Sequence, residues 1–227
     1  MTDIPAPFHI VFVLFDQVTQ LDFTGPAQFL ARMPGAKVHV AVADLSPVMT
    51  DVGFAIMPTV SFTDCPQADL LCVPGGLGVA AALGDERLIS FVAAQAASAA
   101  WVTSVCTGAF ILGRAGLLRG KRATTHWGYT QLLQLVGAVH EDARIVFDGN
   151  LVTAGGVTSG IDFALAIIAR LHGESMARSV QLSLEYDPAP PFAGGTPTTS
   201  PADIVQTMRS RFYDAAALRM EAALTGR

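Results

Sequence analysis

The stretch from Trp101 to Leu118 joins a short apolar run directly to a helical pattern, and Cys106 stands at the junction. The run Trp101–Val105 has the length and the β-branched content of a buried strand. A strand that turns at once into a helix is typical of a nucleophile elbow, although the usual Gly-x-Ser-x-Gly wording is only partly kept. A thiol placed there faces the free N–H groups and the positive dipole end of the helix, which favour the thiolate. The alternative is a buried cysteine that serves as a small hydrophobic residue.

Strand and helix patterns alternate along the rest of the chain. Buried strands are predicted at 8–15, 37–43 and 69–73, with a hairpin at 144–154, and helices at 25–32, 85–99, 127–136, 161–172 and 174–184. This alternation predicts an α/β protein with a doubly wound sheet and one domain over residues 1–227. A Pro- and Gly-rich extended wrap is expected at 187–200, and a terminal helix at 201–224. On that helix one face is predicted to carry Ile204, Met208, Phe212 and Ala215.

Composition narrows the class of protein. Of the 227 residues, 51% are hydrophobic and 15% are charged, and the net charge is −5. This balance lacks the basic footprint of a nucleic-acid binder, and no apolar run is long enough to span a membrane. No basic residue precedes the first apolar run, which argues against a signal peptide, and three cysteines cannot form a full disulfide framework. We therefore expect a cytoplasmic protein.

Two further motifs fall at the carboxyl ends of predicted strands, the edge at which open α/β sheets bind ligands. Asp22 follows the first strand, just before a helix expected to start at Thr24 or Gly25. It is either a catalytic carboxyl or an acid that satisfies the first N–H groups of that helix. The turn Pro74–Gly78 lacks the Gly-Lys-Ser/Thr of a phosphate loop. Its backbone N–H groups, that of Gly76 among them, are expected to donate to an anion or a developing charge.

The remaining candidates are weaker. His126 ends a short predicted strand, and it either approaches Cys106 and tunes the pKa of the thiol or packs as a hydrogen-bonded residue; we expect a supporting, non-catalytic role. Val157 is expected to line the pocket, and Ser159 with Asp162 resembles a capping box. The five histidines show no paired ligand spacing and the cysteines lie far apart, so no metal site is predicted.

Six segments, in their order and spacing, resemble the DJ-1/PfpI superfamily, and within it the isocyanide hydratases most. They are Leu21–Pro26, Val73–Gly76, Thr103–Gly108, Arg122–Trp127, Gly160–Phe163 and Leu182–Phe192. The resemblance covers nearly the whole chain. It implies a flavodoxin-like fold, a homodimer, a cysteine nucleophile and no cofactor.

The resemblance also implies roles for single residues. Cys106 matches the nucleophile, Asp22 its acidic partner, Thr107 the residue after the nucleophile, and Gly76 the turn that offers backbone donors. Protease-like members resemble one another in having histidine where this chain has Thr107, so a peptidase mechanism loses its base. The implied reaction is hydration of an isocyanide to an N-substituted formamide through a thioimidate on Cys106, with Asp22 as general acid and base.

Two other functions remain open at this stage. Transcriptional regulators carry a similar domain joined to a helix-turn-helix pair, and this chain would then be an effector-binding domain. The segment after Ser200 supplies only one predicted helix, without a basic recognition face. A glyoxalase-like or redox-sensing DJ-1 relative would use the same cysteine, which would oxidise readily in such a setting.

Overall fold

The computed structural model describes residues 7–226, and its centre is one large β-sheet. The strands are β1 (Phe8–Val13), β2 (Ala36–Val42), β5 (Val60–Ser61), β6 (Leu70–Val73), β7 (Trp101–Val105), β10 (Ile145–Asp148) and β11 (Leu151–Ala154). They lie in the order β10-β11-β7-β6-β1-β2-β5, and only the β10–β11 pair is antiparallel. The predicted α/β fold with a mostly parallel, doubly wound sheet is confirmed.

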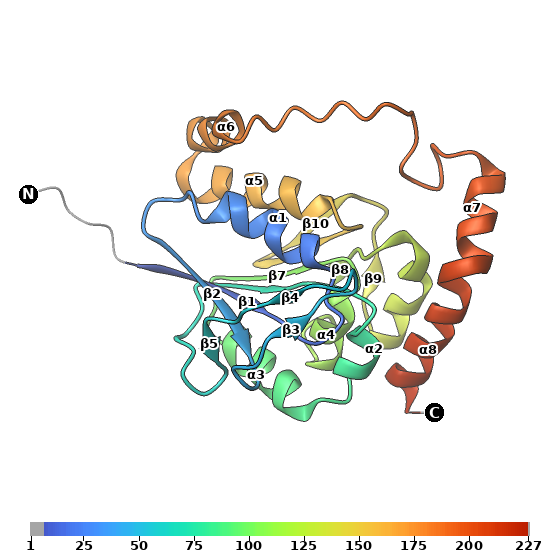
Figure 1. The fold of residues 1–227 in the computed structure, drawn as a ribbon, viewed down its shortest axis with the longest axis horizontal. Coiled ribbons are helices and arrows are strands. Elements are labelled where there is room, and N and C mark those ends of the chain that lie inside the picture. Colours follow the sequence, from blue (N-terminus) through green and yellow to red (C-terminus); the bar gives the residue numbers. More distant parts are fainter. Residues whose placement is uncertain (1–6, 227) are drawn as a thin grey trace, which may run out of the picture.

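Helices cover both faces of the sheet (Figure 1). On one face lie α1 (Gln20–Leu30) and α5 (Ser159–His172), with α6 (Glu174–Ser183) packed on α5. The other face carries α2 (Val79–Ala82), α3 (Glu86–Ala96) and α4 (Gly108–Arg114). In α3, the Asp85 carboxylate accepts hydrogen bonds from the first-turn N–H groups, and Leu88 and Val92 are buried against the core. This end cap and apolar stripe explain why the helix begins where it does.

Two small sheets lie outside the main one. The strands β3 (Val48–Met49) and β4 (Ala55–Ile56) form a hairpin, with Gly53 in the left-handed region at φ +90°. The strands β8 (Arg122–Ala123) and β9 (Val139–His140) pair with each other. The strand predicted to end at His126 therefore stops earlier, and His126 instead directly precedes a 3₁₀ helix, η1 (Trp127–Val136).

Two predictions about helix starts are wrong. Helix α1 begins at Gln20, so Asp22 lies in its first turn and Pro26 lies inside the helix, where it cannot donate a hydrogen bond to the Asp22 carbonyl. The capping box of α5 does not form. Ser159 Oγ donates to the Gly156 carbonyl at 2.6 Å, and the Asp162 carboxylate pairs with Arg144.

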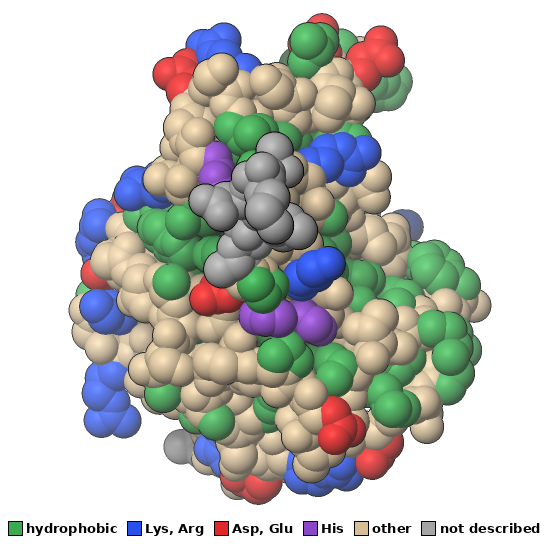
Figure 2. All heavy atoms as spheres, turned by 90° about the vertical axis from the view of Figure 1, so that its left-hand side faces the viewer, with side chains coloured by type: hydrophobic (Ala, Val, Ile, Leu, Met, Phe, Trp, Pro, Cys, Tyr) green, Lys and Arg blue, Asp and Glu red, His purple; other side chains and the backbone are tan. Residues whose placement is uncertain are grey.

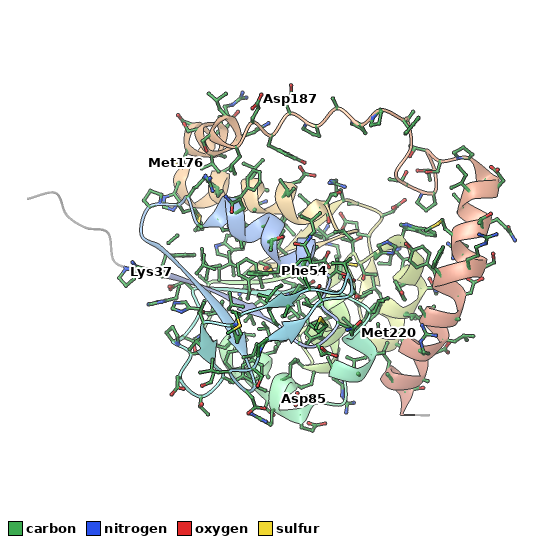
Figure 3. The ribbon with its side chains drawn as sticks, in the orientation of Figure 1. Lys37, Phe54, Asp85, Met176, Asp187 and Met220 are labelled. Carbon is green, nitrogen blue, oxygen red and sulfur yellow. The ribbon has the colours of Figure 1, made fainter. Side chains whose placement is uncertain are left out.

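The C-terminal part leaves the α/β domain and returns to it (Figure 1). After an extended segment at 187–200, the chain forms α7 (Ala202–Met208), a π-helical turn η2 (Arg209–Tyr213) and α8 (Asp214–Thr225). The predicted apolar face is wrong: Ile204 and Phe212 are 52% and 58% exposed, whereas Met220, labelled in Figure 3, is buried. The wider π turn rotates the side chains that follow it, so a uniform period of 3.6 residues fails here.

One apolar cluster is left on the surface by the β3–β4 hairpin. Val52, Phe54 and Met57 are 66%, 50% and 67% exposed. Figure 2 shows hydrophobic side chains gathered along its right-hand edge, the side on which this hairpin lies. Across residues 7–226, no helix is both long enough and apolar enough to cross a membrane.

Candidate active site

The carboxyl ends of three neighbouring strands bring the predicted site residues together. The strands β1, β6 and β7 are adjacent, and the segments after them carry Asp22, the turn with Gly75 and Gly76, and Cys106. The strand order changes direction at β1, which makes this edge a topological switch point, the usual place for a ligand in an open α/β sheet. Three residues proposed from separate motifs thus share one site.

The backbone of Cys106 has the strained geometry of a nucleophile elbow. Its φ is +56°, a left-handed conformation that costs a non-glycine residue about 1–3 kcal/mol. Hydrogen bonds hold it in place: its N–H donates to the carbonyls of Ala154 at 3.0 Å and Gly155 at 2.8 Å, and its carbonyl accepts from Thr125 Oγ1 at 2.7 Å. The strain is maintained by β11 and by the segment before η1.

Two glycines allow the loops to approach one another. A Cβ on Gly108 would collide with the carbonyl oxygen of Val73, the last residue of β6. A Cβ on Gly75 would lie 2.6 Å from Thr107 Oγ1 and 2.9 Å from Asp22 Oδ2. Close packing of the elbow, the turn after β6 and the carboxyl therefore requires glycine at both positions.

Asp22 is a fully buried carboxyl that faces the elbow and not its own helix. Its Oδ2 accepts a hydrogen bond from the Gly75 N–H at 2.9 Å, and its Oδ1 is buried without a hydrogen-bond partner. Burial raises its pKa from 3.8 to about 7; the Gly75 hydrogen bond opposes this shift, and the charge of Asp51 adds to it. Asp22 is thus suited to hold and release a proton near neutral pH.

Cys106 is 6% exposed, and its surroundings favour the protonated form of the thiol. Burial raises the pKa of the thiol well above its ordinary value, and the negative charge of Asp22 raises it further, while the N–H and side chain of Thr107 act in the opposite direction. The N–H of Thr107, at the start of α4, favours the thiolate as expected, but burial outweighs it. A thiolate here needs Asp22 to be neutral.

Thr107 and Gly76 bond to each other. The Gly76 N–H donates to Thr107 Oγ1 at 3.1 Å, and the Gly75 N–H is used by Asp22. The expectation that the Gly76 N–H is an open donor for an anion is therefore wrong in this structure. The turn instead holds the side chains of Asp22 and Thr107 beside Cys106.

His126 and Val157 lie around the elbow. The ring of His126 accepts a hydrogen bond at Nδ1 from the Gly128 N–H at 3.1 Å, and burial lowers its pKa to about 4. The ring is therefore neutral at pH 7 and supplies no positive charge to the thiol. Val157 is half-buried in the turn that follows Gly155, whose carbonyl bonds the Cys106 N–H.

The sequence reasoning missed two tyrosines. Burial raises the pKa of Tyr129 to about 12 and also raises that of Tyr213, and in both cases the negative charge of a Cys106 thiolate adds to the shift. Both phenol groups therefore lie within electrostatic reach of the sulfur. Tyr129 follows His126 by three residues, a helical spacing that points to a shared face. Tyr213 had no such signal, because the π turn brings it inward.

The site offers the chemistry of a thiol and a carboxyl, namely nucleophilic attack and proton transfer. Within the part of the chain that the structure describes, no three or more His, Cys, Asp or Glu side chains are grouped so that they could hold a metal ion.

Comparisons with known proteins agree with this arrangement. The chain is 51% identical over 213 residues to an isonitrile hydratase from Pseudomonas putida, covering 94% of this chain and 93% of the relative. It superposes on a ThiJ/PfpI family protein from Pseudomonas syringae with a TM-score of 0.94 and 37% identity, over 99% of this chain and 94% of that one. It is 28% identical to the HTH-type transcriptional regulator GbdR from Pseudomonas aeruginosa, covering 80% of this chain but 51% of the regulator. The sequence profile of the DJ-1/PfpI family matches residues 9–170, and the chain belongs to that family.

Proposed function

We propose that this protein is an isocyanide hydratase, which adds water to an isocyanide and releases an N-substituted formamide. The observation that carries the proposal is the pairing of the Cys106 thiol with the buried carboxyl of Asp22, in a chain similar along nearly its whole length to an isonitrile hydratase. Isonitrile and isocyanide name the same R–N≡C group. The reaction needs a soft nucleophile and a group that gives and then takes a proton, and this site provides both.

The first step forms a covalent intermediate. The Cys106 sulfur, as thiolate, attacks the terminal carbon of the isocyanide while protonated Asp22 delivers its proton to that carbon. A carbon–sulfur bond and a carbon–hydrogen bond form, and the product is a thioimidate, R–N=CH–S, on Cys106. Asp22 is left ionised. The raised pKa of Asp22 supports its part as the acid, because an aspartic acid with an ordinary pKa would carry no proton at neutral pH.

The second step hydrates the thioimidate. Ionised Asp22 takes a proton from water as the oxygen attacks the carbon, and that proton passes to nitrogen. The tetrahedral adduct, R–NH–CH(OH)–S, then collapses: its hydroxyl proton returns to Asp22, the carbon–sulfur bond breaks, and the formamide leaves. General acid–base catalysis of this kind contributes about 10²–10⁴ in rate. The Thr107 N–H, which lowers the pKa of the thiol, would stabilise the departing thiolate.

The other two functions have less support. The similarity to the regulator GbdR covers about half of that protein, and it leaves the match to the hydratase unexplained. A glyoxalase-like reaction would use the same thiol, so only a substrate comparison separates it. A peptidase would need a histidine base, but the residue after the nucleophile is Thr107. The ring of His126 does not replace it, because its Nδ1 already accepts a hydrogen bond from the Gly128 N–H.

The predictions about oligomeric state, cellular compartment, substrate and cofactor belong to this proposal. We expect a homodimer in the cytoplasm that binds an uncharged isocyanide and uses no cofactor. The exposed apolar cluster of Val52, Phe54 and Met57 supports the dimer, because such patches often mark protein interfaces.

The test is a substrate comparison with purified protein. Alkyl and aryl isocyanides are supplied in parallel with methylglyoxal, and formamide and lactate are measured by NMR. The proposal predicts formamide from the wild type and a loss of at least about 10³-fold in Cys106→Ala, with an unchanged circular dichroism spectrum. Lactate without formamide, or full formamide production by Cys106→Ala, contradicts it.

A further inference from the structure

The turn of the β3–β4 hairpin docks against the loop that leads into α1. The Gln17 N–H donates to the Met49 carbonyl at 2.7 Å, and the Asp51 N–H donates to the Val18 carbonyl at 3.1 Å. On its other side Val18 forms an antiparallel bridge with Gly76, in the turn after β6. The hairpin, the loop and the Gly-rich turn thus lie side by side, and Phe54, labelled in Figure 3, marks the hairpin.

A chain of hydrogen bonds leads from this hairpin to Asp22. Thr19, the residue before α1, donates from Oγ1 to Asp51 Oδ2 at 2.5 Å. The Thr19 N–H donates to the Gly75 carbonyl at 3.0 Å, and its own carbonyl accepts from the Asp22 N–H at 3.1 Å. The other oxygen of Asp51, Oδ1, is buried without a hydrogen-bond partner. A second carboxyl is therefore fixed beside the first turn that holds Asp22.

We propose that Asp51 is a positioning residue for the hydration reaction: its carboxylate fixes Thr19 at the start of α1, and its negative charge keeps the proton on Asp22. This inference rests on the proposed function, in which Asp22 must be protonated when the substrate is attacked. Asp51 acts through Asp22 and Thr19 and is not itself a catalytic residue. It sets the pH range in which the acid is available.

The electrostatics around Asp22 agree with this role. After burial and the opposing Gly75 hydrogen bond, the charge of Asp51 is the next largest influence on the pKa of Asp22, and it raises it. Two thiols also lie near Asp22: a hydrogen bond with Cys106 lowers the pKa of Asp22, and the buried Cys72 thiol in β6 has its own pKa raised to about 12, so it stays neutral. Helix α5 packs on α1 and carries Asp162 in its first turn, but that carboxylate pairs with Arg144. Two like charges near one another favour the protonated form of the more buried group.

The experiment removes the charge of Asp51 and keeps its shape. Asp51→Asn retains an oxygen that accepts from Thr19, and Asp64→Asn is the matched control, because Asp64 accepts from Ser61 Oγ at 2.5 Å at the far edge strand. The active form pairs a thiolate with protonated Asp22, and the thiol has the higher pKa, so in the profile of kcat/KM against pH the acid limb has the apparent pKa of Asp22. We expect Asp51→Asn to move this limb to lower pH by about half a unit or more, and Asp64→Asn to leave it in place. Asp51→Glu, which restores the charge, should move it back.

A second readout does not depend on turnover. The carboxyl carbon of Asp22 is titrated by ¹³C NMR in the substrate-free protein, assigned by its loss in Asp22→Asn, and its midpoint should fall in Asp51→Asn. Asp51→Ser serves as the neutral variant if Asp51→Asn does not fold. A midpoint and a limb unchanged in a folded neutral variant overturn the inference. If the wild type hydrates no isocyanide, the proposed function fails, and the NMR midpoint still decides whether Asp51 controls the proton on Asp22.

Discussion

At the scale of single residues, Asp22 destabilises the folded protein at neutral pH. Its carboxyl is fully buried, one of its oxygens lacks a partner, and its pKa is raised to about 7. The folded chain therefore holds this proton more tightly than the unfolded chain does. The contribution of Asp22 to the free energy of unfolding is most favourable below about pH 4, decreases as pH rises towards 7, and is constant above. At about 1.4 kcal/mol per pKa unit, the loss is on the order of 4 kcal/mol.

Replacing Asp22 with asparagine should remove this cost along with the activity. We expect the free energy of unfolding of Asp22→Asn to exceed that of the wild type at pH 8, and the difference to shrink towards pH 4. Urea unfolding at pH 4, 6 and 8 measures it, with Asp64→Asn, an exposed carboxylate, as the control. A variant that is less stable than the wild type at pH 8 would show that Asp22 is a structural residue and not a strained acid.

At the scale of elements, the nucleophile elbow and the presence of a C-terminal helix were predictable, but the buried face of that helix was not. The elbow is encoded locally: an apolar run, Cys106 and Gly108 follow one another, and the tight turn between strand and helix follows from them. The face of the terminal helix depends on the π turn at Arg209–Tyr213, which hydrophobic periodicity cannot show. Tyr213 therefore faces His126, at 4.9 Å between ring centroids, whereas its neighbour Phe212 is exposed.

These two neighbouring aromatic residues form a matched pair for a test. Tyr213 packs on His126 and Trp127 and leaves no room for a side chain at Gly128, so Tyr213→Ala should lower the free energy of unfolding by about 2 kcal/mol. It should also speed the alkylation of Cys106 by iodoacetamide, because the ring lies close to the sulfur and its removal gives the reagent more room to approach. Phe212→Ala should change neither by much. Urea unfolding and alkylation rates measure both, and a larger effect from Phe212→Ala would contradict the π-helical register.

At the scale of the whole molecule, the sheet explains why residues distant in sequence share one site. Parallel strands were recognisable as apolar runs, so the meeting of Asp22 and Cys106 at one edge could be expected before the structure was known. The docking of the β3–β4 hairpin against the loop before α1 could not be expected from the sequence. The contact between Thr19 and Asp51 joins two loops through hydrogen bonds alone, and the pattern of residues around Asp51 carries no sign of it.

The same hairpin leads to a prediction about assembly. Phe54 is half exposed in the same short segment as the exposed Val52 and Met57, and we expect these side chains to be covered by a second copy of the chain. Sedimentation equilibrium should give twice the 23.8 kDa of one chain. Phe54→Asp should shift the equilibrium towards the monomer, and Phe192→Asp, at an exposed position in the extended segment, should not. A wild type that sediments as a monomer at micromolar concentration would contradict the dimer.

The covalent bond to Cys106 is the central claim, and one measurement tests it most directly. The wild type is mixed with an alkyl isocyanide, quenched within milliseconds by borohydride, which reduces the carbon–nitrogen double bond of a thioimidate, and digested for mass spectrometry. The peptide that contains Cys106 should gain the mass of one isocyanide and two hydrogens during turnover, and Cys106→Ala should show neither adduct nor formamide. Rapid formamide production by the wild type with no adduct on Cys106 at any time point would contradict the account.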